Sequence, residues 1–217
     1  GVFCDVDFDR QGKQVGHASL PYSVDRSPFF QIKLPICQIR NGDGPSLLLM
    51  AGVHGDEYEG NFALNRVIST IKTSDIKGRL TILPMANGPA VLAGRRCSPF
   101  DSGNLNRSFV DNGNGGPTFR IAHFIEKELM PGHEIVFDLH SGGTSMEFIQ
   151  CGLCELNPDK KRVQKALDLL DMIALDHSFT ADNGTGSPTS MAAAYRAGLV
   201  GISAELGGGA TVTPDTM

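Results

Sequence analysis

The stretch Leu47-Leu48-Leu49-Met50-Ala51-Gly52-Val53-His54-Gly55-Asp56-Glu57 decides the fold class of this chain. Its first five residues form a continuous apolar run, which is typical of a strand buried on both faces of a sheet. A helix over residues 57–71 is expected next, because apolar side chains recur there at i, i+3, i+4 and i+7: Leu64, Val67, Ile68 and Ile71. The stretch therefore predicts a strand, a tight corner and a helix, the repeating unit of an α/β protein.

The remainder of the chain continues this alternation. Further apolar runs predict strands at Ile32–Ile39, Leu80–Leu83, Ile135–Leu139, Glu147–Cys151 and Leu199–Ala204. Helices are expected at 119–130, at 160–175 and from a start at Ser187-Pro188. Because strands alternate with helices throughout, we expect an α/β fold with a largely parallel sheet.

Two segments show no clear periodicity. Residues 1–30 are polar and contain proline, so we expect an irregular N-terminal lead-in to a catalytic domain over residues 31–217. Residues 85–118 are rich in Gly, Pro, Asn, Asp and Ser and predict a long loop. Structureless loops beyond ~15 residues are uncommon in compact domains, so this loop is expected to carry function.

The composition bounds the function classes. The 217 residues are 41% hydrophobic and 20% charged, which indicates a globular protein. The net charge of −5 argues against nucleic-acid and anionic-membrane partners, and the sequence holds no apolar run of the ~18 residues that a membrane span needs. The five cysteines are odd in number and irregularly spaced, which argues against a disulfide framework and favours a reducing, cytoplasmic location.

Polar residues follow three of the predicted buried strands. His54 and Glu57 come after the first, His140 after the second, and Glu205 after the last. Ligands of open α/β sheets bind outside the carboxyl ends of the strands, so these four side chains are expected to converge. Two His and one Glu suit a catalytic zinc ion, which takes about three protein ligands and keeps a further position open. Asp138 shares the strand face of His140 and could orient its imidazole.

Simpler interpretations stand beside this one. A single His at a strand end is usually a surface or core residue, and four histidines are interpreted in that way: His17, His123, His133 and His177. Glu205 is either a solvated carboxylate or a general base that takes a proton from the attacking water. Cys151 and Cys154 lack a second Cys-x-x-Cys pair and are interpreted as core residues.

The predicted long loop carries Arg95, Arg96, Asp101 and the run Gly103-Asn104-Leu105-Asn106-Arg107-Ser108-Phe109. Arginine suits bidentate capture of a carboxylate or stabilisation of an oxyanion, and asparagine adds an amide donor. The alternative is a set of surface arginines on a polar loop.

Four motifs together resemble the succinylglutamate desuccinylase/aspartoacylase family, which is related to zinc carboxypeptidases. They are Gly52-Val53-His54-Gly55-Asp56-Glu57-Tyr58-Glu59-Gly60, Gly103-Asn104-Leu105-Asn106-Arg107, Asp138-Leu139-His140-Ser141-Gly142-Gly143 and Glu205-Leu206-Gly207-Gly208-Gly209. Within the family, they are most similar to the Nα-acetyl-L-2,4-diaminobutyrate deacetylases. The resemblance implies a zinc-carboxypeptidase-like three-layer αβα fold with a mostly parallel or mixed central sheet.

The resemblance also implies roles for individual residues. One zinc ion per chain would be held by His54, Glu57 and His140, with Glu205 as the general base and acid. Asn106 and Arg107 match the pair that binds the α-carboxylate of the substrate. Arg96 resembles the arginine that polarises the scissile carbonyl, although Arg95 is adjacent and either could serve.

The expected activity is hydrolysis of the amide bond of a small N-acyl amino acid, and a homo-oligomer is compatible with it. A metallocarboxypeptidase that acts on peptide C-termini is the nearest alternative, followed by a zinc-binding module without turnover and a redox protein based on Cys151 and Cys154. Only twelve residues follow Glu205, whereas the family continues into a smaller, mostly β region that we expect to be absent here. The chain is therefore expected to be the catalytic core of a longer enzyme.

Overall fold

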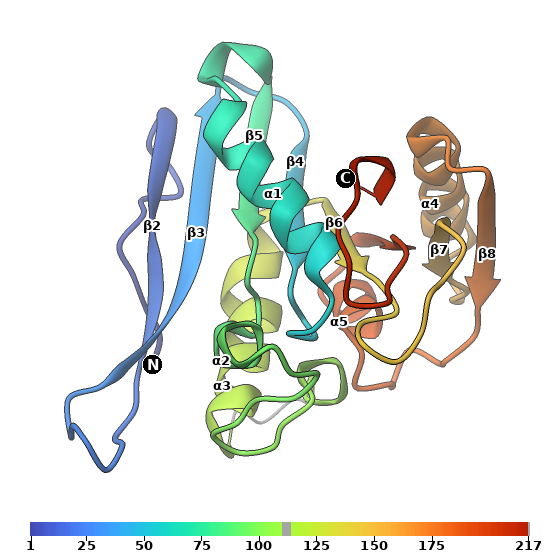
Figure 1. Ribbon diagram of the computed structural model, residues 1–217. Coiled ribbons are helices and arrows are strands. Elements are labelled where there is room, and N and C mark those ends of the chain that lie inside the picture. The colour runs from blue at the N-terminus through green and yellow to red at the C-terminus, as the bar shows by residue number, and fades with distance from the viewer. Residues whose placement is uncertain (110–113, 217) are drawn as a thin grey trace.

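The computed structural model describes residues 1–109 and 114–216 (Figure 1). Residues 110–113 of the predicted loop and residue 217 lie outside the described residues. The described strands form one sheet in the order β1-β2-β3-β5-β4-β6-β9-β7-β8. The strands are β1 Phe3–Cys4, β2 Gly12–Pro21, β3 Gln31–Asn41, β4 Ser46–Ala51, β5 Gly78–Leu83, β6 Ile135–His140, β7 Cys151–Glu155, β8 His177–Ala181 and β9 Val200–Glu205. The helices are α1 Tyr58–Thr70, α2 Gly88–Ala93, α3 Pro117–His123, α4 Lys160–Ile173 and α5 Ser190–Arg196.

The centre of the sheet is parallel and its margins are largely antiparallel. Strands β5, β4, β6 and β9 are joined by parallel pairings, whereas β1, β2 and β3 pair antiparallel up to β5. On the other side, β7 pairs antiparallel with β9 and parallel with β8. The α/β fold with a mixed central sheet is thereby confirmed. The carboxyl ends of β4, β6 and β9 meet at one edge of the sheet.

Helices cover both faces of the sheet and make the fold three-layered. On one face, α1 and α4 pack against apolar side chains of the central strands, among them Leu139, Ile202 and Ala204. On the other face, α3 and α5 pack against Leu48, Met50 and Val136. Figure 1 shows α1 in front of the central strands. Among the described helices, none combines the length and the apolar character that crossing a membrane requires.

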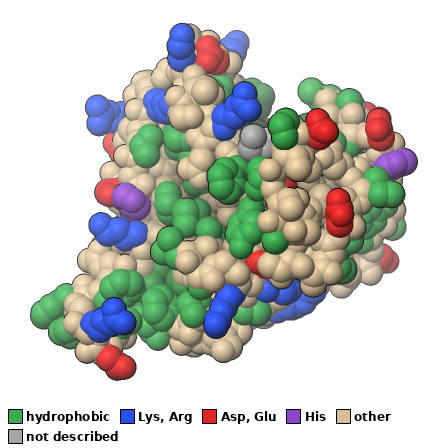
Figure 2. All heavy atoms as spheres, viewed as in Figure 1, with side chains coloured by type: hydrophobic (Ala, Val, Ile, Leu, Met, Phe, Trp, Pro, Cys, Tyr) green, Lys and Arg blue, Asp and Glu red, His purple; other side chains and the backbone are tan. Residues whose placement is uncertain are grey.

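The face shown in Figure 2 carries Lys and Arg side chains scattered around its margin, with apolar side chains across its middle.

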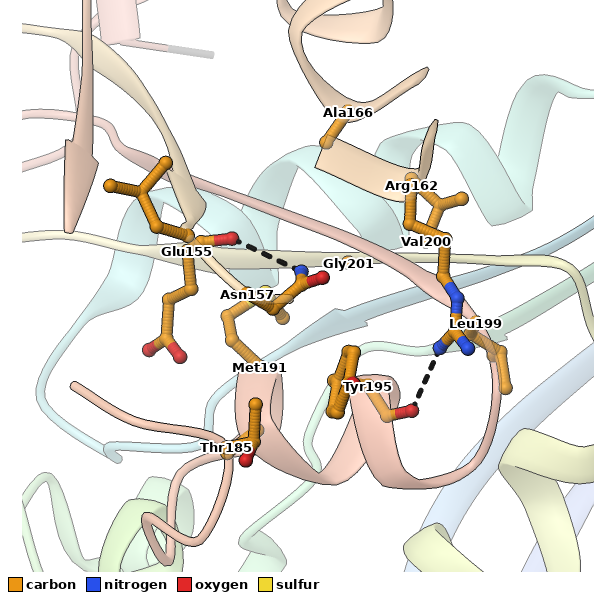
Figure 3. A pocket seen from close by; sticks show the side chains of 12 residues that line it. Glu155, Asn157, Arg162, Ala166, Thr185, Met191, Tyr195, Leu199, Val200 and Gly201 are labelled. Carbon is orange, nitrogen blue, oxygen red and sulfur yellow. Dashed lines mark hydrogen bonds between the residues drawn. The ribbon is translucent and has the colours of Figure 1, made fainter. Parts of the chain in front are cut away.

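A hydrogen bond joins α4 to α5: Arg162 Nη1 donates to the Tyr195 carbonyl oxygen at 2.9 Å (Figure 3). The Arg162 guanidinium also lies 4.9 Å from the centre of the Tyr195 ring. These contacts position α5, whose first turn borders the site described below.

The close approach of α1 to the sheet depends on a glycine. A Cβ atom at Gly60 would lie 2.8 Å from the Leu139 Cβ and 2.9 Å from the Ala51 Cβ. Side-chain carbons do not pack at such distances, so any larger residue at this position would push the helix off β4 and β6. Gly60 therefore sets how near the start of α1 lies to the carboxyl ends of these strands.

The expectation of an irregular segment over residues 1–30 is wrong. Residues 12–21 form β2, which pairs antiparallel with β3 from Gly12↔Arg40 to Pro21↔Gln31. Most of this strand is only partly buried, with Ala18 and Leu20 fully buried near its end. Because one face of β2 remains half-exposed, its sequence carries polar residues that hide the strand pattern.

Four other elements differ from the expectations. The strand predicted at Glu147–Cys151 is wrong, because β7 begins at Cys151, which lies opposite Glu205 in the antiparallel pairing with β9. Helix α5 begins at Ser190 and not at Ser187-Pro188, because the Thr189 hydroxyl caps it by accepting from Ala192 N at 3.2 Å. The predicted loop 85–118 contains α2 and a 3-10 turn at Leu105–Arg107. Strand β8 was not predicted.

His133 occupies a buried polar site beside the sheet. Its Nδ1 donates to the Leu129 carbonyl oxygen at 2.9 Å, and its Nε2 lies 2.7 Å from Thr81 Oγ1. Burial lowers the pKa of His133 from 6.5 to about 4, with the charge of Arg79 acting in the same direction and the backbone hydrogen bonds opposing it. The folded protein thus keeps this imidazole neutral.

We predict that His133 makes the protein less stable in mild acid. The unfolded chain protonates His133 below about pH 6.5, whereas the folded chain does so only near pH 4, so the free energy of unfolding falls as the pH falls through this window. Denaturant unfolding of the wild type and of His133→Asn at pH 7 and pH 4.5 measures the effect. The stability advantage of the wild type should shrink by up to about 3 kcal/mol, and an advantage that does not change with pH would contradict the account.

Candidate metal centre and active site

The corner between β4 and α1 places the side chains of His54 and Glu57 next to each other. Gly52 has φ 71°, a left-handed conformation that favours glycine. A Cβ atom at Gly55 would lie 2.0 Å from the carbonyl carbon of Ala90, so only glycine fits where the corner touches α2. Helix α1 then begins directly after Glu57, its N-cap residue. The corner is therefore fixed by backbone packing, and the two side chains point back over the end of the sheet.

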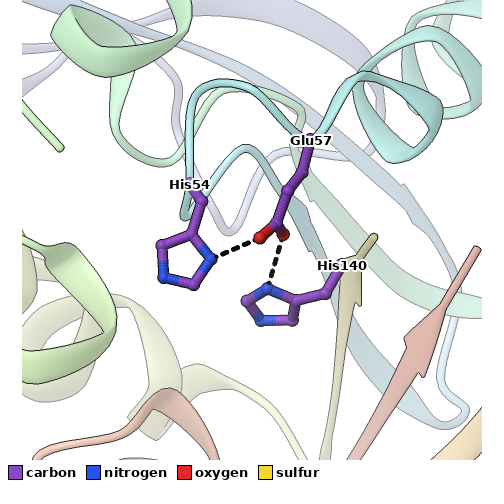
Figure 4. A group of neighbouring side chains, drawn as sticks. All are labelled: His54, Glu57 and His140. Carbon is purple, nitrogen blue, oxygen red and sulfur yellow. Dashed lines mark hydrogen bonds and ion pairs between the residues drawn. The ribbon is translucent and has the colours of Figure 1, made fainter. Parts of the chain in front are cut away.

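Three buried side chains meet at this end of the sheet (Figure 4). His54 Nδ1 lies 2.7 Å from Glu57 Oε1, and His140 Nδ1 lies 2.9 Å from Glu57 Oε2. One ligand atom from each residue lies within 4.8 Å of the others. In the part of the chain that the structure describes, this is the one group of three or more His, Cys, Asp or Glu residues placed to share a metal ion.

The outer nitrogens of both imidazoles are engaged by oxygen atoms. His54 Nε2 donates to Asn104 Oδ1 at 3.1 Å, and His140 Nε2 donates to Asp138 Oδ2 at 2.9 Å. With Nε2 protonated, a neutral imidazole presents its Nδ1 lone pair toward Glu57. Each short contact between Nδ1 and the carboxylate therefore needs a positive charge between the two atoms, either a proton or a metal ion.

The electrostatics show the same preference for positive charge. Burial alone would raise the pKa of Glu57, but hydrogen bonds and charge from His140 and His54 outweigh it and lower the pKa to about 2. For His140, burial opposes protonation, while Asp138 and Glu57 raise the pKa well above its ordinary value. Two imidazole nitrogens and one carboxylate also form a ligand set that zinc accepts, so the residues fit a zinc ion.

Asp138 is held in turn by Ser190, a residue outside the candidates predicted from the sequence. Ser190 Oγ donates to Asp138 Oδ2 at 2.6 Å, and Ser190 N donates to Asn106 Oδ1 at 2.9 Å. Ser190 therefore joins the residue behind His140 to the loop that carries Asn106. The usable signal is the serine- and threonine-rich helix start, whose predicted position lies two residues before the observed one.

Glu205 lies beside the three-residue cluster at the end of β9. It is directly opposite His140 in the parallel pairing of β6 and β9. Its Oε2 is buried and, within the described residues, has no hydrogen-bond partner. Burial raises the pKa of Glu205 to about 7; the charges of Glu57 and Asp138 add to this, whereas those of His140 and Arg96 oppose it.

A cavity of about 410 Å³ opens above the cluster, and the predicted site residues line it. Arg96 reaches inward from the loop, with Nη1 3.3 Å from Glu57 Oε1. Asn106 and Arg107 lie on the same wall, where Arg107 Nη1 donates to the Asn106 carbonyl oxygen at 2.7 Å. Arg96 belongs to this lining, whereas Arg95 does not. The structure thus brings His54, Glu57, His140, Glu205, Arg96, Asn106 and Arg107 around one space, with Asp138 behind it.

The remaining candidates, Cys151 and Cys154 among them, lie outside this cavity lining. Cys151 and Cys154 are both free thiols, and burial raises the pKa of each. Cys154 is fully buried among apolar side chains of α4 and β9, as expected for a core cysteine. The histidines interpreted as surface or core residues, His17, His123, His133 and His177, contribute nothing to the cavity wall.

The sequence matches the family model of the "Succinylglutamate desuccinylase/Aspartoacylase catalytic domain" over residues 43–217. The chain belongs to this family. The matched region contains all the residues of the cluster and the cavity wall named above. The expected membership is thereby confirmed.

Relatives extend the comparison. The chain is 37% identical over 216 residues to the N-alpha-acetyl-L-2,4-diaminobutyric acid deacetylase of Halomonas elongata, a match that covers 100% of this chain and 63% of that protein. The structure of a succinylglutamate desuccinylase from Silicibacter sp. TM1040 has a TM-score of 0.95 at 33% identity, and covers 99% of this chain and 65% of that one. The chain thus spans about two thirds of the length of these relatives.

The fold also extends beyond the family. A candidate metallopeptidase from Shewanella baltica has a TM-score of 0.63 at 17% identity, covering 92% of this chain and 81% of that chain. At this identity the likeness concerns the fold alone. It agrees with the three-layer, zinc-carboxypeptidase-like fold expected from the motifs.

We predict that the wild-type chain binds one zinc ion and that His140→Ala binds none after dialysis. The variant removes one of the three candidate ligands, and the remaining pair would not complete a buried site. Elemental analysis of the dialysed proteins measures the stoichiometry. His177→Ala, at an exposed position of β8, is the matched control and should retain one zinc ion. Stoichiometric zinc in His140→Ala would mean that the ligand set is wrong.

We predict that Ser190→Ala weakens zinc binding by roughly 10- to 100-fold, the range found when a residue behind a metal ligand is lost. The variant removes the donor that holds Asp138, which in turn orients His140. Competition with a chromophoric chelator measures the affinity, and Ser178→Ala on exposed β8 serves as control. Equal affinity in wild type and Ser190→Ala would show that Asp138 needs no such support.

Proposed function

We propose that this chain is the catalytic part of a zinc-dependent hydrolase that cleaves the amide bond of a small N-acyl amino acid. The observation that carries the proposal is the meeting of His54, Glu57 and His140 at the wall of a cavity that also holds Glu205. Membership of the family and the likeness to a deacetylase support the reaction class. The products would be a carboxylate, such as acetate, and a free amino acid.

His54, Glu57 and His140 would hold the zinc ion. When bound, zinc supplies a Lewis acid that polarises the scissile carbonyl and makes water easier to deprotonate. Asn104 and Asp138 keep the two imidazoles in the orientation that directs Nδ1 at the shared centre. These two contacts fix the ring orientation of both proposed ligands from outside the centre that they share.

Glu205 would act as the general base and then as the general acid. Its carboxylate takes the proton of the attacking water and passes it to the amine that leaves. Glu205 lines the same cavity as His54, Glu57 and His140. Among the described residues, no donor forms a hydrogen bond to its Oε2. A free carboxylate oxygen is what a proton acceptor requires.

Arg96, Asn106 and Arg107 would bind the substrate. Arg96 reaches the metal-binding carboxylate of Glu57, so its guanidinium lies where an oxyanion would form during attack. Arg107 and the Asn106 amide line the same cavity and would anchor the α-carboxylate. Anchoring this group places the amide within attacking distance, which contributes to the rate by proximity.

A substrate panel separates the proposal from its nearest alternative. The zinc-loaded chain is assayed with N-acetyl amino acids, N-succinyl amino acids and peptides with free C-termini. Hydrolysis of N-acyl amino acids, with peptides turned over poorly, supports the proposal. Turnover of peptides alone would identify a metallocarboxypeptidase instead.

We predict that Glu205→Gln retains zinc but loses several orders of magnitude in kcat. Glutamine keeps the shape of the side chain but cannot take a proton, so the water is no longer activated. Glu128→Gln, at an exposed position, is the matched control and should keep both zinc and activity. Near-normal kcat in zinc-loaded Glu205→Gln would refute the general-base role.

A further inference from the structure

A second carboxylate lines the cavity, and the proposed mechanism does not use it. Glu155 is the last residue of β7, whose antiparallel pairing with β9 sets Cys151 opposite Glu205 and Leu153 opposite Ser203. Since alternate residues of a strand share a face, Glu155 lies on the same face as Leu153. Leu153, Glu155, Ser203 and Glu205 all line the cavity. Glu155 thus lies on the cavity wall, further along the strands from the metal cluster than Glu205.

The contacts of Glu155 leave its charge without a counter-ion. Its Oε1 accepts hydrogen bonds from Asn183 Nδ2 at 3.1 Å and from Thr189 Oγ1 at 3.5 Å, and both donors are neutral. Figure 3 shows the Glu155 carboxylate pointing away from Arg162. Arg162 pairs instead with Asp159 Oδ2 at 2.8 Å. Among the described residues, no ion pair reaches Glu155, and no donor reaches its Oε2.

The Glu155 carboxylate is partly withdrawn from water. Burial raises the pKa of Glu155, and the charge of Asp182 adds to this, while the hydrogen bonds of Asn183 and Thr189 oppose it. A carboxylate taken partly out of water is stabilised when a positive group comes into contact with it. An ammonium group in the cavity could supply that contact at the free Oε2.

The position of Glu155 relative to the substrate-binding wall defines which ammonium group it could meet. Thr189, which donates to Glu155, directly precedes Ser190, whose backbone N–H donates to Asn106. The same wall therefore presents the cationic Arg107 and the anionic Glu155 to one cavity. A substrate with its α-carboxylate on Arg107 could direct its side chain toward Glu155.

Resting on the proposed function, we propose that Glu155 binds a side-chain ammonium group and so selects N-acyl diamino acids over N-acyl amino acids with neutral or acidic side chains. The relative from Halomonas elongata is named for such a substrate, an N-acetylated diaminobutyric acid. The relative from Silicibacter is named for succinylglutamate, whose side chain is acidic. A carboxylate in this place would favour the first kind of side chain and repel the second.

A purely structural role for Glu155 has a different signature. Asn183 and Thr189 belong to the segment between β8 and α5, and Glu155 could simply hold that segment in place. Glu155→Gln retains an amide oxygen that accepts both hydrogen bonds but removes the charge. The variant therefore separates the two roles, because only charge recognition depends on the ionised form.

The test compares two substrates of nearly equal shape, Nα-acetyl-2,4-diaminobutyrate and N-acetylnorvaline, with N-acetylglutamate as the acidic member. The zinc-loaded wild-type chain should prefer the diamino substrate in kcat/KM. In Glu155→Gln, the ratio of diamino to norvaline kcat/KM should fall roughly 10- to 100-fold, the effect of losing a hydrogen bond between charged groups. Asp171→Asn, on the exposed face of α4, should leave the ratio unchanged. An unchanged ratio in Glu155→Gln would overturn the inference.

Calorimetric binding of free 2,4-diaminobutyrate and norvaline to the zinc-loaded proteins provides a readout without turnover. If the wild type hydrolyses none of the substrates but binds diaminobutyrate more tightly, and Glu155→Gln loses that preference, the inference holds and the proposed hydrolysis fails. If the wild type shows no preference between the two isosteres in either assay, the inference fails whatever the variant does. The comparison within the wild type keeps the test decisive even where Glu155→Gln does not fold.

Discussion

The site depends on one electrostatic constraint, which is that His54, Glu57 and His140 hold two imidazole Nδ1 atoms against one buried carboxylate. Such an arrangement persists only if a positive charge lies among the three groups. The rest of the fold supplies the rigidity that keeps them together. Parallel pairing sets the ends of β4 and β6 side by side, Gly55 fits the corner against α2, and Gly60 brings α1 close to the sheet.

Hydrogen bonds behind the two imidazoles connect this cluster to the segments that would bind substrate. Asp138 and Asn104 engage the outer nitrogens of the two imidazoles, and Ser190 ties Asp138 to Asn106. The residue before Ser190, Thr189, both caps α5 and contacts Glu155. The start of α5 therefore couples the orientation of His140, a proposed metal ligand, to the shape of the cavity wall, and a shift of this helix would disturb both.

The convergence of His54, Glu57, His140 and Glu205 was predictable from the sequence because these residues follow apolar runs at the ends of parallel strands. Three runs with polar, glycine-flanked ends were enough to place His54, His140 and Glu205 at one edge. Ser190 and Glu155 were not predictable in the same way, because their roles depend on where α5 begins and on how β7 pairs with β9. Strand β2 was missed because its half-exposed face carries polar residues, so its alternation is weak.

The most direct test of the account is an anomalous-difference map, recorded at the zinc absorption edge from crystals of the zinc-loaded chain. The account predicts one peak between His54 Nδ1, Glu57 and His140 Nδ1, at about 2.0–2.2 Å from the ligand atoms. The electron density from the same crystals should show both Nε2 atoms still bound to Asn104 and Asp138. A peak located elsewhere, such as beside Cys151, or no peak at this cluster, would contradict the central claim.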